Sequence, residues 1–315
     1  MIITKKKLTK IFESLYTIRA AEKKISEIYS TDKIKSPIHL SIGQEAIAVG
    51  ICQNLKKSDL ISNTYRSHAS FLAKGGSLKS FFSELYGKET GCAGGRGGSM
   101  HLVDIKNGIL GSSAVVGTTI PVAAGYALKE KLIKKNNIVV CIFGDGATEE
   151  GCFYETLNFS ALKKLPILFV CENNGLAIHT GLKKRWSKNN LTEKVKSFGI
   201  KSKIIEKPDV LNIYKISNKC INYVRKNKLP FFLEIKCLRE YEHVGPSEDL
   251  KKKYRDKSYE KKFSKNLFSN NEFNKINLIL KSKIKKNCDV KVKKAIQFAE
   301  RSKFPAIKTI KNFIY

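Results

Sequence analysis

Apolar residues recur at helical spacing near the start of the chain. Within residues 8–30, one face of a helix would collect Leu8, Ile11, Phe12, Leu15, Ile18, Ile25 and Ile28. This spacing predicts an amphipathic opening helix. Its apolar face would pack against the domain core or against another subunit.

From residue 119 onward, helical patterns alternate with short continuous apolar runs. The pattern predicts, in chain order, a helix over 119–134, the strand IVVCIF (138–143), a helix near 150–164, the strand ILFVC (167–171), a strand over 201–206, a helix from after Pro208 towards Lys226, and a strand over 231–238. Continuous apolar strands separated by helices are typical of a parallel sheet that is buried on both faces. We therefore predict an α/β fold with a doubly wound, mostly parallel sheet and helices on both faces.

The remaining segments are less regular. Short apolar stretches broken by glycine fill 37–117, and the run GCAGGRGGSMH (91–101) predicts a loop that needs unusual backbone angles or a close approach to another group. After Asp249 the chain is rich in lysine and helical in pattern. We expect an N-terminal helical segment (1–36), a central α/β domain (37–250) and a helical C-terminal segment (251–315) that packs on the domain or on a subunit interface.

The formal charge of +31 raises the question of nucleic-acid binding, because a basic surface supplies affinity for phosphates. The excess is almost all lysine, since the 59 basic residues include only eight arginines. Basic residues also lack the interleaved aromatic residues of a platform for single strands. The charge therefore favours a solvated surface over a nucleic-acid role, and an acidic protein partner stays possible.

The eight cysteines are scattered without a CxxC pair. Cys141 and Cys171 lie inside apolar strands, which is typical of reduced core thiols rather than of a zinc site or a disulfide framework. No run of eighteen apolar residues is present, and the first residues do not resemble a secretory signal. We expect a cytoplasmic protein without a membrane segment.

Candidate ligands follow two of the predicted strands. GDG (144–146) comes directly after one strand and before a helix, where glycines let backbone N–H groups approach a phosphate. Asp145 can supply one oxygen to magnesium, and Asn174, which follows the next strand, can supply a second. The two strand ends together predict a site for magnesium and a phosphate group.

The segment from Gly144 to Asn174 resembles the thiamine-diphosphate motif of the alpha subunits of 2-oxo acid dehydrogenases, the first component of the pyruvate, branched-chain and acetoin complexes. Other motifs agree with that family in the same order. They are HLSIGQEA from His39, NTYRSH from Asn63, GGRGGSMH from Gly94, AVVGTTIPVAAG from Ala114, and the tail AERSKFP. The resemblance covers about residues 8–250 and implies thiamine diphosphate and Mg²⁺ as cofactors.

The resemblance also implies site residues. Tyr65 and Arg66 would contact the diphosphate, as suits a guanidinium. The cofactor would be lined by Ala114, Val116, Asp145, Gly146, Ala147 and Asn174. Magnesium would be held by Asp145, Asn174 and the carbonyl of Leu176. His39, His68 and His243 would act near the thiazolium and the substrate, and their titration near neutral pH suits proton transfer.

Several assignments stay open at the level of sequence. His101 and His39 could each be structural residues of their loops, and Glu149 and Glu150 could simply begin a solvated helix. The loops IHTGLKKRW, with His179 and Trp186, and REYEHVGPSED depart from the family, which leaves the choice of substrate in doubt.

The resemblance implies that a separate beta subunit supplies an activating glutamate, since no second cofactor-binding domain is apparent. It implies two alpha and two beta chains, a small 2-oxo acid as substrate, and transfer of the acyl group to a lipoyl-bearing acyltransferase. Pyruvate is the default substrate. Branched-chain oxo acids, acetoin, a specialised biosynthetic substrate, or a non-catalytic cofactor-binding relative are alternatives.

Overall fold

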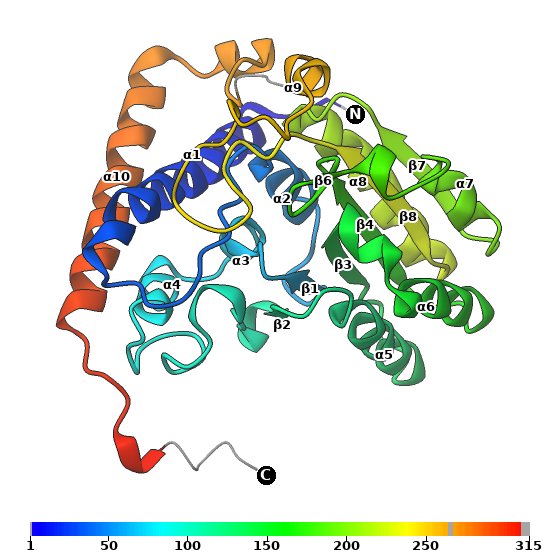
Figure 1. Cartoon of the computed structure of the whole chain (residues 1–315), viewed down its shortest axis with the longest axis horizontal. Coiled ribbons are helices and arrows are strands. Elements are labelled where there is room, and N and C mark those ends of the chain that lie inside the picture. Colours follow the sequence, from blue (N-terminus) through cyan, green and yellow to red (C-terminus); the bar gives the residue numbers. More distant parts are fainter. Residues whose placement is uncertain (1, 264–266, 310–315) are drawn as a thin grey trace.

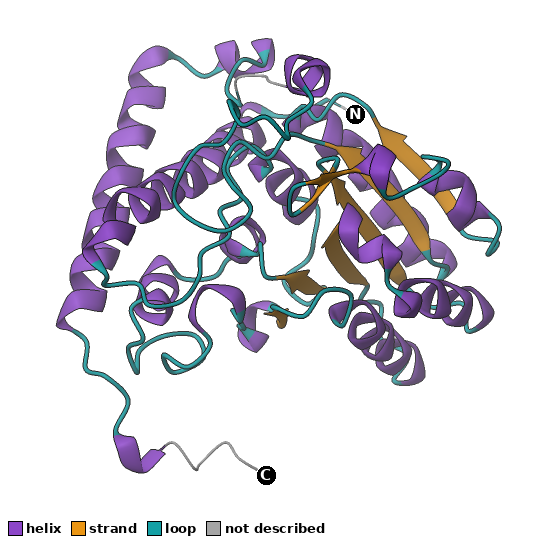
Figure 2. Ribbon diagram, viewed as in Figure 1, coloured by secondary structure: helices purple, strands orange, loops and turns teal. Residues whose placement is uncertain are grey.

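The computed structural model describes residues 2–263 and 267–309, so residues 264–266 and 310–315 of the predicted C-terminal segment lie outside the description. Six strands form a central sheet in the order β2-β1-β3-β4-β8-β7, and every neighbouring pair is parallel. The strands are β1 (Leu60–Thr64), β2 (Ile109–Ser113), β3 (Val139–Gly144), β4 (Ile167–Asn173), β7 (Lys201–Ile205) and β8 (Phe231–Lys236). Helices cover both faces of the sheet (Figure 2), which confirms the predicted doubly wound architecture.

Strand β3 shows why the central strands are continuously apolar. Val140 and Ile142 belong to the core on one face of the sheet, whereas Val139, Cys141 and Phe143 belong to the core on the other. Alternate side chains of a strand point to opposite faces, so a strand covered on both faces has no position left for a polar residue. The predicted strands over 138–143 and 167–171 therefore lie in the middle of the sheet, whereas the one over 201–206 lies at its edge.

The larger core lies under one layer of helices. This layer contains α1 (Lys5–Ile28), α2 (Glu45–Cys52), α4 (Leu78–Leu85), α8 (Val210–Asn227) and α10 (Leu278–Arg301). The predicted opening helix is confirmed as α1. Helix α10 packs against α1 and α4 at the outer side of this layer, as Figure 1 shows at the left. The larger core contains residues from all three predicted segments, and the boundaries between those segments remain a prediction.

A smaller core lies on the opposite face, under α5 (Thr119–Leu132), α6 (Gly151–Leu162) and α7 (Leu191–Lys196). The helices predicted over 119–134 and near 150–164 are confirmed within about two residues, which is the usual uncertainty of a helix end. Helices α5 and α6 lie side by side (Figure 1) and contact each other. Their outer surface is exposed and partly apolar.

The segment 37–117 is more ordered than its sequence predicts, because it contains α2, β1, α3 (His68–Lys74), α4 and β2. Its glycine-rich loop does make a close approach, but to protein groups. The buried carboxylate of Glu84 accepts hydrogen bonds from the backbone N–H groups of Ala93, Gly95, Gly97 and Gly98 at 2.7–3.1 Å. A Cβ on Gly95, whose φ is +77°, would lie 2.5 Å from the carbonyl carbon of Gly87. Glycine is therefore required there for local packing.

The other elements are short. A hairpin joins β5 (Leu176–Ala177) to β6 (Thr180–Gly181), and α9 (Lys257–Phe263) precedes α10. The 3₁₀ helices are η1 (Tyr29–Thr31), η2 (Gly98–Met100), η3 (Ile105–Asn107), η4 (Asp145–Glu149), η5 (Leu182–Lys184) and η6 (Asn271–Lys275). Among the described residues, no helix combines the length and the apolar character needed to cross a membrane.

Candidate active site

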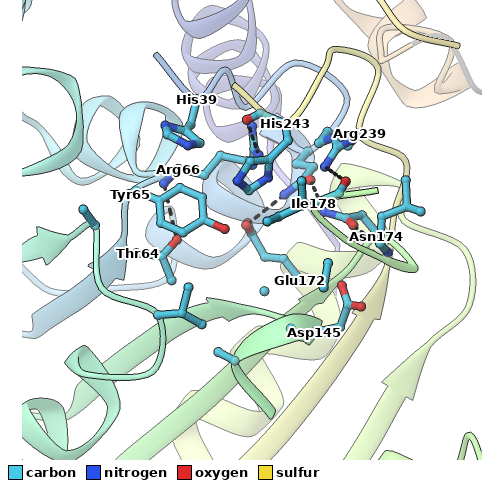
Figure 3. Close-up of a pocket in the computed structure, with 18 of the residues that line it drawn as sticks. His39, Thr64, Tyr65, Arg66, Asp145, Glu172, Asn174, Ile178, Arg239 and His243 are labelled. Atoms are coloured by element: carbon cyan, nitrogen blue, oxygen red, sulfur yellow. Dashed lines mark hydrogen bonds between the residues drawn. The ribbon is translucent and has the colours of Figure 1, made fainter. Parts of the chain in front are cut away.

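A cavity of about 340 Å³ lies beyond the carboxyl ends of β1, β3, β4 and β8. Figure 3 shows His39, Tyr65, Arg66, Asp145 and His243 around it. Of the residues predicted for the site, all except His68 line this cavity: His39, Tyr65, Arg66, Ala114, Val116, Asp145, Gly146, Ala147, Asn174, Leu176 and His243. The sheet explains the convergence, because Gly144 and Glu172 are paired in register and the next residues of both strands enter the same space.

Asp145 is buried at the first position after β3. Its Oδ2 atom forms an ion pair with Arg185, whereas its Oδ1 atom has no hydrogen-bond partner within residues 2–263 and 267–309. Burial raises the pKa of Asp145, and Arg185 acts against this increase. The residue opens the 3₁₀ helix η4, and α6 begins only at Gly151, so no α-helix starts directly after GDG. A buried carboxylate oxygen without a partner is a suitable ligand for a cation.

Asn174 belongs to a chain of buried amide and carboxylate groups. Its Oδ1 atom accepts the backbone N–H of Leu176 at 3.1 Å, and its Nδ2 atom donates to Gln44 Oε1 at 2.9 Å. The Nε2 atom of Gln44 in turn donates to Glu172 Oε2 at 2.9 Å. Burial raises the pKa of Glu172 to about 8, although Arg66 and Gln44 oppose the shift. The second strand end therefore carries two polar side chains held by a residue from another segment.

Arg66 is a buried cation that lacks an ion-pair partner. It donates from Nη1 to the carbonyl of Leu40 at 2.7 Å and from Nη2 to the carbonyl of His243 at 3.0 Å. No carboxylate of the described residues lies within 4 Å of its guanidinium, to judge from the ion pairs found there. Burial lowers the pKa of Arg66 to about 10, so the side chain is still charged at neutral pH. A desolvated guanidinium facing a cavity favours an anionic ligand.

Three rings form one wall of the cavity. The ring centroids of His39 and Tyr65 are 4.4 Å apart, those of His39 and His243 are 5.0 Å apart, and those of Tyr65 and His243 are 5.5 Å apart. Burial, with Arg66 as the next cause, lowers the pKa of His39 to about 3 and that of His243 to about 4. The expected titration near neutral pH is therefore wrong for this arrangement, since both imidazoles are neutral there. They can accept a proton from a substrate or share one through a hydrogen bond.

His68 does not reach the cavity. It is fully buried at the start of α3, where Nδ1 lies 2.9 Å from Glu22 Oε1 and Nε2 lies 2.7 Å from Ser99 Oγ. The order of groups is that of a nucleophilic triad, but all three side chains are closed to solvent and none lines the cavity. The geometry supports a structural link between α1, α3 and the glycine-rich loop, and it does not support the catalytic role predicted for His68.

Other histidines and acids of the motifs have local roles. Nδ1 of His101 lies 3.1 Å from the carbonyl of Gly97, and its Nε2 accepts the backbone N–H of Ala114 at 3.3 Å, so His101 ties the glycine loop to the cavity wall. Glu149 and Glu150 both line the cavity, and Glu149 forms an ion pair with Arg185. They are therefore part of the site's surroundings rather than only a solvated helix start.

Sequence reasoning missed four residues of the site and its supports, namely Gln44, Glu172, Arg185 and Arg239. Arg239 is buried and donates to the carbonyls of Tyr241 and Ile178 at 2.9 and 3.1 Å, with Asp249 at 3.4 Å. Gln44 and Glu172 lie in the quoted motifs HLSIGQEA and ENN. The two arginines lie in the loops that depart from the family, so no signal in the sequence marked them.

No group of three or more His, Cys, Asp or Glu side chains among the described residues is arranged to bind a metal. The predicted magnesium ligands contain only one such side chain, because the others are an amide oxygen and a backbone carbonyl. That set would rely on phosphate oxygens and water for the remaining positions, which is how Mg²⁺ is usually held.

Known proteins with similar sequences identify the family of this chain. Residues 13–308 match the family model described as dehydrogenase E1 component. The alpha subunit of acetoin:2,6-dichlorophenolindophenol oxidoreductase from Bacillus subtilis is 31% identical over 320 residues, covering 99% of this chain and 95% of the relative. The alpha subunit of the pyruvate dehydrogenase E1 component from Rickettsia prowazekii is 34% identical over 322 residues, covering 99% and 96%. The chloroplastic subunit alpha-3 of the same component from Arabidopsis thaliana is 33% identical over 317 residues, covering 97% and 73%.

The fold and the cavity define an α/β protein whose candidate site lies at the carboxyl ends of a parallel sheet. The chain belongs to the dehydrogenase E1 component family. Within that family it is an alpha subunit of a 2-oxo acid dehydrogenase, which is an oxidoreductase, and the family implies thiamine diphosphate as the cofactor.

Proposed function

We propose that this chain, together with a beta subunit, decarboxylates pyruvate with thiamine diphosphate and Mg²⁺ and passes the acyl group to a lipoyl-bearing acyltransferase. The observation that carries the proposal is the pairing of two unsatisfied groups in one cavity. Among the residues that the structure describes, no carboxylate pairs with the buried cation of Arg66, and no group donates to the buried Oδ1 atom of Asp145. A ligand that contains both an anion and a cation would give Arg66 an anionic partner and Asp145 Oδ1 a cationic one.

The donor set fits a magnesium diphosphate. Asp145 would offer Oδ1 and Asn174 would offer Oδ1, while the carbonyl of Leu176 lies in the same wall of the cavity. A Cβ on Gly146 would lie 3.1 Å from the Cβ of Ala177, so glycine at this position lets η4 pack closely against β5 beside the cavity. Arg66 and Tyr65 would face the diphosphate. Hard oxygen ligands and a guanidinium suit magnesium and phosphate respectively.

When bound, thiamine diphosphate supplies the electron sink that decarboxylation of a 2-oxo acid requires. The residues of the chain would bind the cofactor, orient the substrate and transfer protons. Neutral His39 and His243 lie against Tyr65, where either can accept a proton from, or hydrogen-bond, an oxygen of the substrate. Burial and, after it, the charge of Arg66 lower the pKa of both imidazoles, and a negative ligand at Arg66 would weaken the second of these effects.

The need for a beta subunit has support from the surface around the cavity. Ala114 and Val116 line the cavity, while Val115 between them is exposed, as is Val122 on the first turns of α5. Exposed apolar residues beside a cofactor site are typical of a subunit interface. The chain would thus supply the part of the site that binds diphosphate, and the partner would supply the group that activates the cofactor.

Binding of thiamine diphosphate tests the cofactor assignment. The single tryptophan, Trp186, lies in the same small pocket as Asp145, so its fluorescence should report ligation. Asp145→Ala should weaken magnesium-dependent binding more than 100-fold, whereas Asp104→Ala, at the cap of η3 and away from the cavity, should leave it unchanged. Equal binding by both variants would refute the metal assignment.

Turnover tests the substrate and the partner. The purified complex of alpha and beta chains should decarboxylate pyruvate with an artificial electron acceptor, and the isolated alpha chain should not. Acetoin and branched-chain 2-oxo acids should react at less than about a tenth of that rate, because each must pass the same small cavity. Faster turnover of acetoin would favour the activity named for the Bacillus subtilis relative instead.

A further inference from the structure

Gln44 is a buried amide that connects two distant parts of the chain. It occupies the position before α2, is 2% exposed, and makes no side-chain cap on that helix. Both polar atoms of its side chain are used at the end of β4 instead, with Glu172 and Asn174, which lie 128 and 130 positions away. Glutamine is not among the residues that usually cap a helix, and here its amide links the start of α2 to the end of β4.

The direction of these hydrogen bonds determines which end of the Asn174 amide is available. In the structure Gln44 donates from Nε2 to Glu172 Oε2, which leaves its carbonyl oxygen as the atom that faces Asn174. Asn174 must therefore turn its NH₂ group towards Gln44. Its Oδ1 atom is left with the N–H of Leu176 and one free lone pair.

We propose that Gln44 is a positioning residue that holds the Asn174 amide with its oxygen, rather than its NH₂ group, available to magnesium. This inference rests on the proposed function. Gln44 touches neither the metal nor the reacting atoms in this arrangement and acts through Asn174. Groups that orient a metal ligand in this way commonly change metal affinity 10- to 100-fold when they are removed.

Three variants of the alpha-beta complex separate this role from simple packing. Gln44→Met keeps the volume and removes both hydrogen bonds, so the Mg²⁺ concentration for half-maximal thiamine diphosphate binding should rise at least about tenfold. Gln44→Glu keeps the acceptor for Asn174 but places a carboxylate against Glu172, and it should also raise the requirement. The double variant Gln44→Glu with Glu172→Gln restores one donor and one acceptor in exchanged order, and should return the requirement to within about threefold of the wild type.

Asn54→Leu is the matched control. Asn54 lies just beyond the other end of α2, and its amide donates to the carbonyls of Gly50 and Tyr214 and to Ser217 Oγ at 2.8–3.0 Å. Loss of these bonds should lower the melting temperature without changing the magnesium requirement. Thermal melting of every variant, measured alongside binding, separates folding from ligation.

The outcomes distinguish the two levels of the argument. If the wild-type complex binds thiamine diphosphate without any need for a divalent cation, the proposed function fails and this inference fails with it. If the wild type needs Mg²⁺ but Gln44→Met has the same requirement, only the role of Gln44 is refuted. An equal increase for Asn54→Leu, or no recovery in the double variant when it melts like the wild type, would likewise refute that role.

Discussion

The two faces of the sheet are covered in different ways. On one face, α1, α2, α4, α8 and α10 cover the larger core, and α10 adds a second row of helix over α1 and α4. On the other face, α5, α6 and α7 form a single row over the smaller core. The outer side of α5 and α6 exposes the apolar residues Val122, Leu132, Phe159 and Leu162.

Exposed apolar residues occur on both faces, since α10 exposes Leu278, Ile279 and Val290 as well, so the position of the cavity decides on which face we expect a partner. A helix with apolar residues on its outer surface leaves apolar area in contact with water. Covering that area with a partner is favourable, because it removes the area from water. The apolar surface on α5 lies next in the chain to Ala114 and Val116, which line the cavity. The face with one row of helices is therefore the side on which we expect the beta subunit.

The largest expected effect compares one leucine on each face. Leu15 of α1 is fully buried, whereas Leu162 at the end of α6 is 71% exposed. Leu15→Ala should lower the free energy of unfolding by about 3 kcal/mol, because it leaves a cavity in the larger core. Leu162→Ala should change it by less than about 0.5 kcal/mol. Urea unfolding of the isolated chain measures both, and similar losses would remove the distinction between the faces.

A charge on each outer surface tests assembly. Val122 on α5 is 51% exposed and Val290 on α10 is 43% exposed, so both sites can accept a lysine without unfolding. Val122→Lys should weaken association with the beta chain at least about tenfold, since an unpaired charge would be desolvated at the interface. Val290→Lys should leave association unchanged in sedimentation experiments. The opposite pattern would place the beta subunit on α10.

The stability of the folded chain should depend on pH through two histidines of the cavity, His39 and His243. The pKa of His39 is lowered to about 3 and that of His243 to about 4 in the folded chain, from the ordinary value of 6.5. Between pH 6.5 and 4, both imidazoles therefore take up protons in the unfolded chain but stay neutral in the folded chain. Stability is thus greatest above pH 6.5 and is lost as the pH falls towards 4. The double variant His39→Gln with His243→Gln should show a shallower decrease in melting temperature over this range. Parallel curves would contradict the neutral state of the two rings.

The smallest effect concerns the loop between β5 and β6. Ile178 has a φ of +53°, an unfavourable region for a β-branched residue, and its side chain is largely exposed. Ile178→Gly should raise the free energy of unfolding by about 1 kcal/mol through relief of this strain. Ile178→Val keeps the β-branch and should give no gain. Thermal melting of both variants decides whether the strain is present.

The sequence predicts the sheet well because continuous apolar runs have few alternatives once they alternate with helices. The same reasoning brought Asp145 and Asn174 together, since neighbouring parallel strands end at one edge. The residues that orient these ligands were not predictable in this way. Gln44 reaches Asn174 only through the tertiary fold that brings the start of α2 to the end of β4, a contact across 130 positions that no local pattern records.

His68 shows the opposite limit. The motif NTYRSH places His68 two residues after Arg66. A sequence motif does not determine the direction of a side chain at the first residue of a helix. In the structure the ring faces Glu22 on α1, and it is held there by two hydrogen bonds. The glycine-rich loop is confirmed in both of its predicted features. Gly94, Gly95 and Gly98 have positive φ values, and the group that the loop wraps around is Glu84 of the same chain.

The contact between α1 and α10 has a consequence during synthesis of the protein. Thr17 of α1 donates to Cys288 Sγ of α10, 271 positions later, and Lys291 of α10 forms an ion pair with Glu13. At roughly 5–20 residues per second, a ribosome needs on the order of 15–50 s to add the chain between these helices. During this time, the side of α1 that packs against α10 stays uncovered. A newly made chain would be a substrate for chaperones until its last helix emerges.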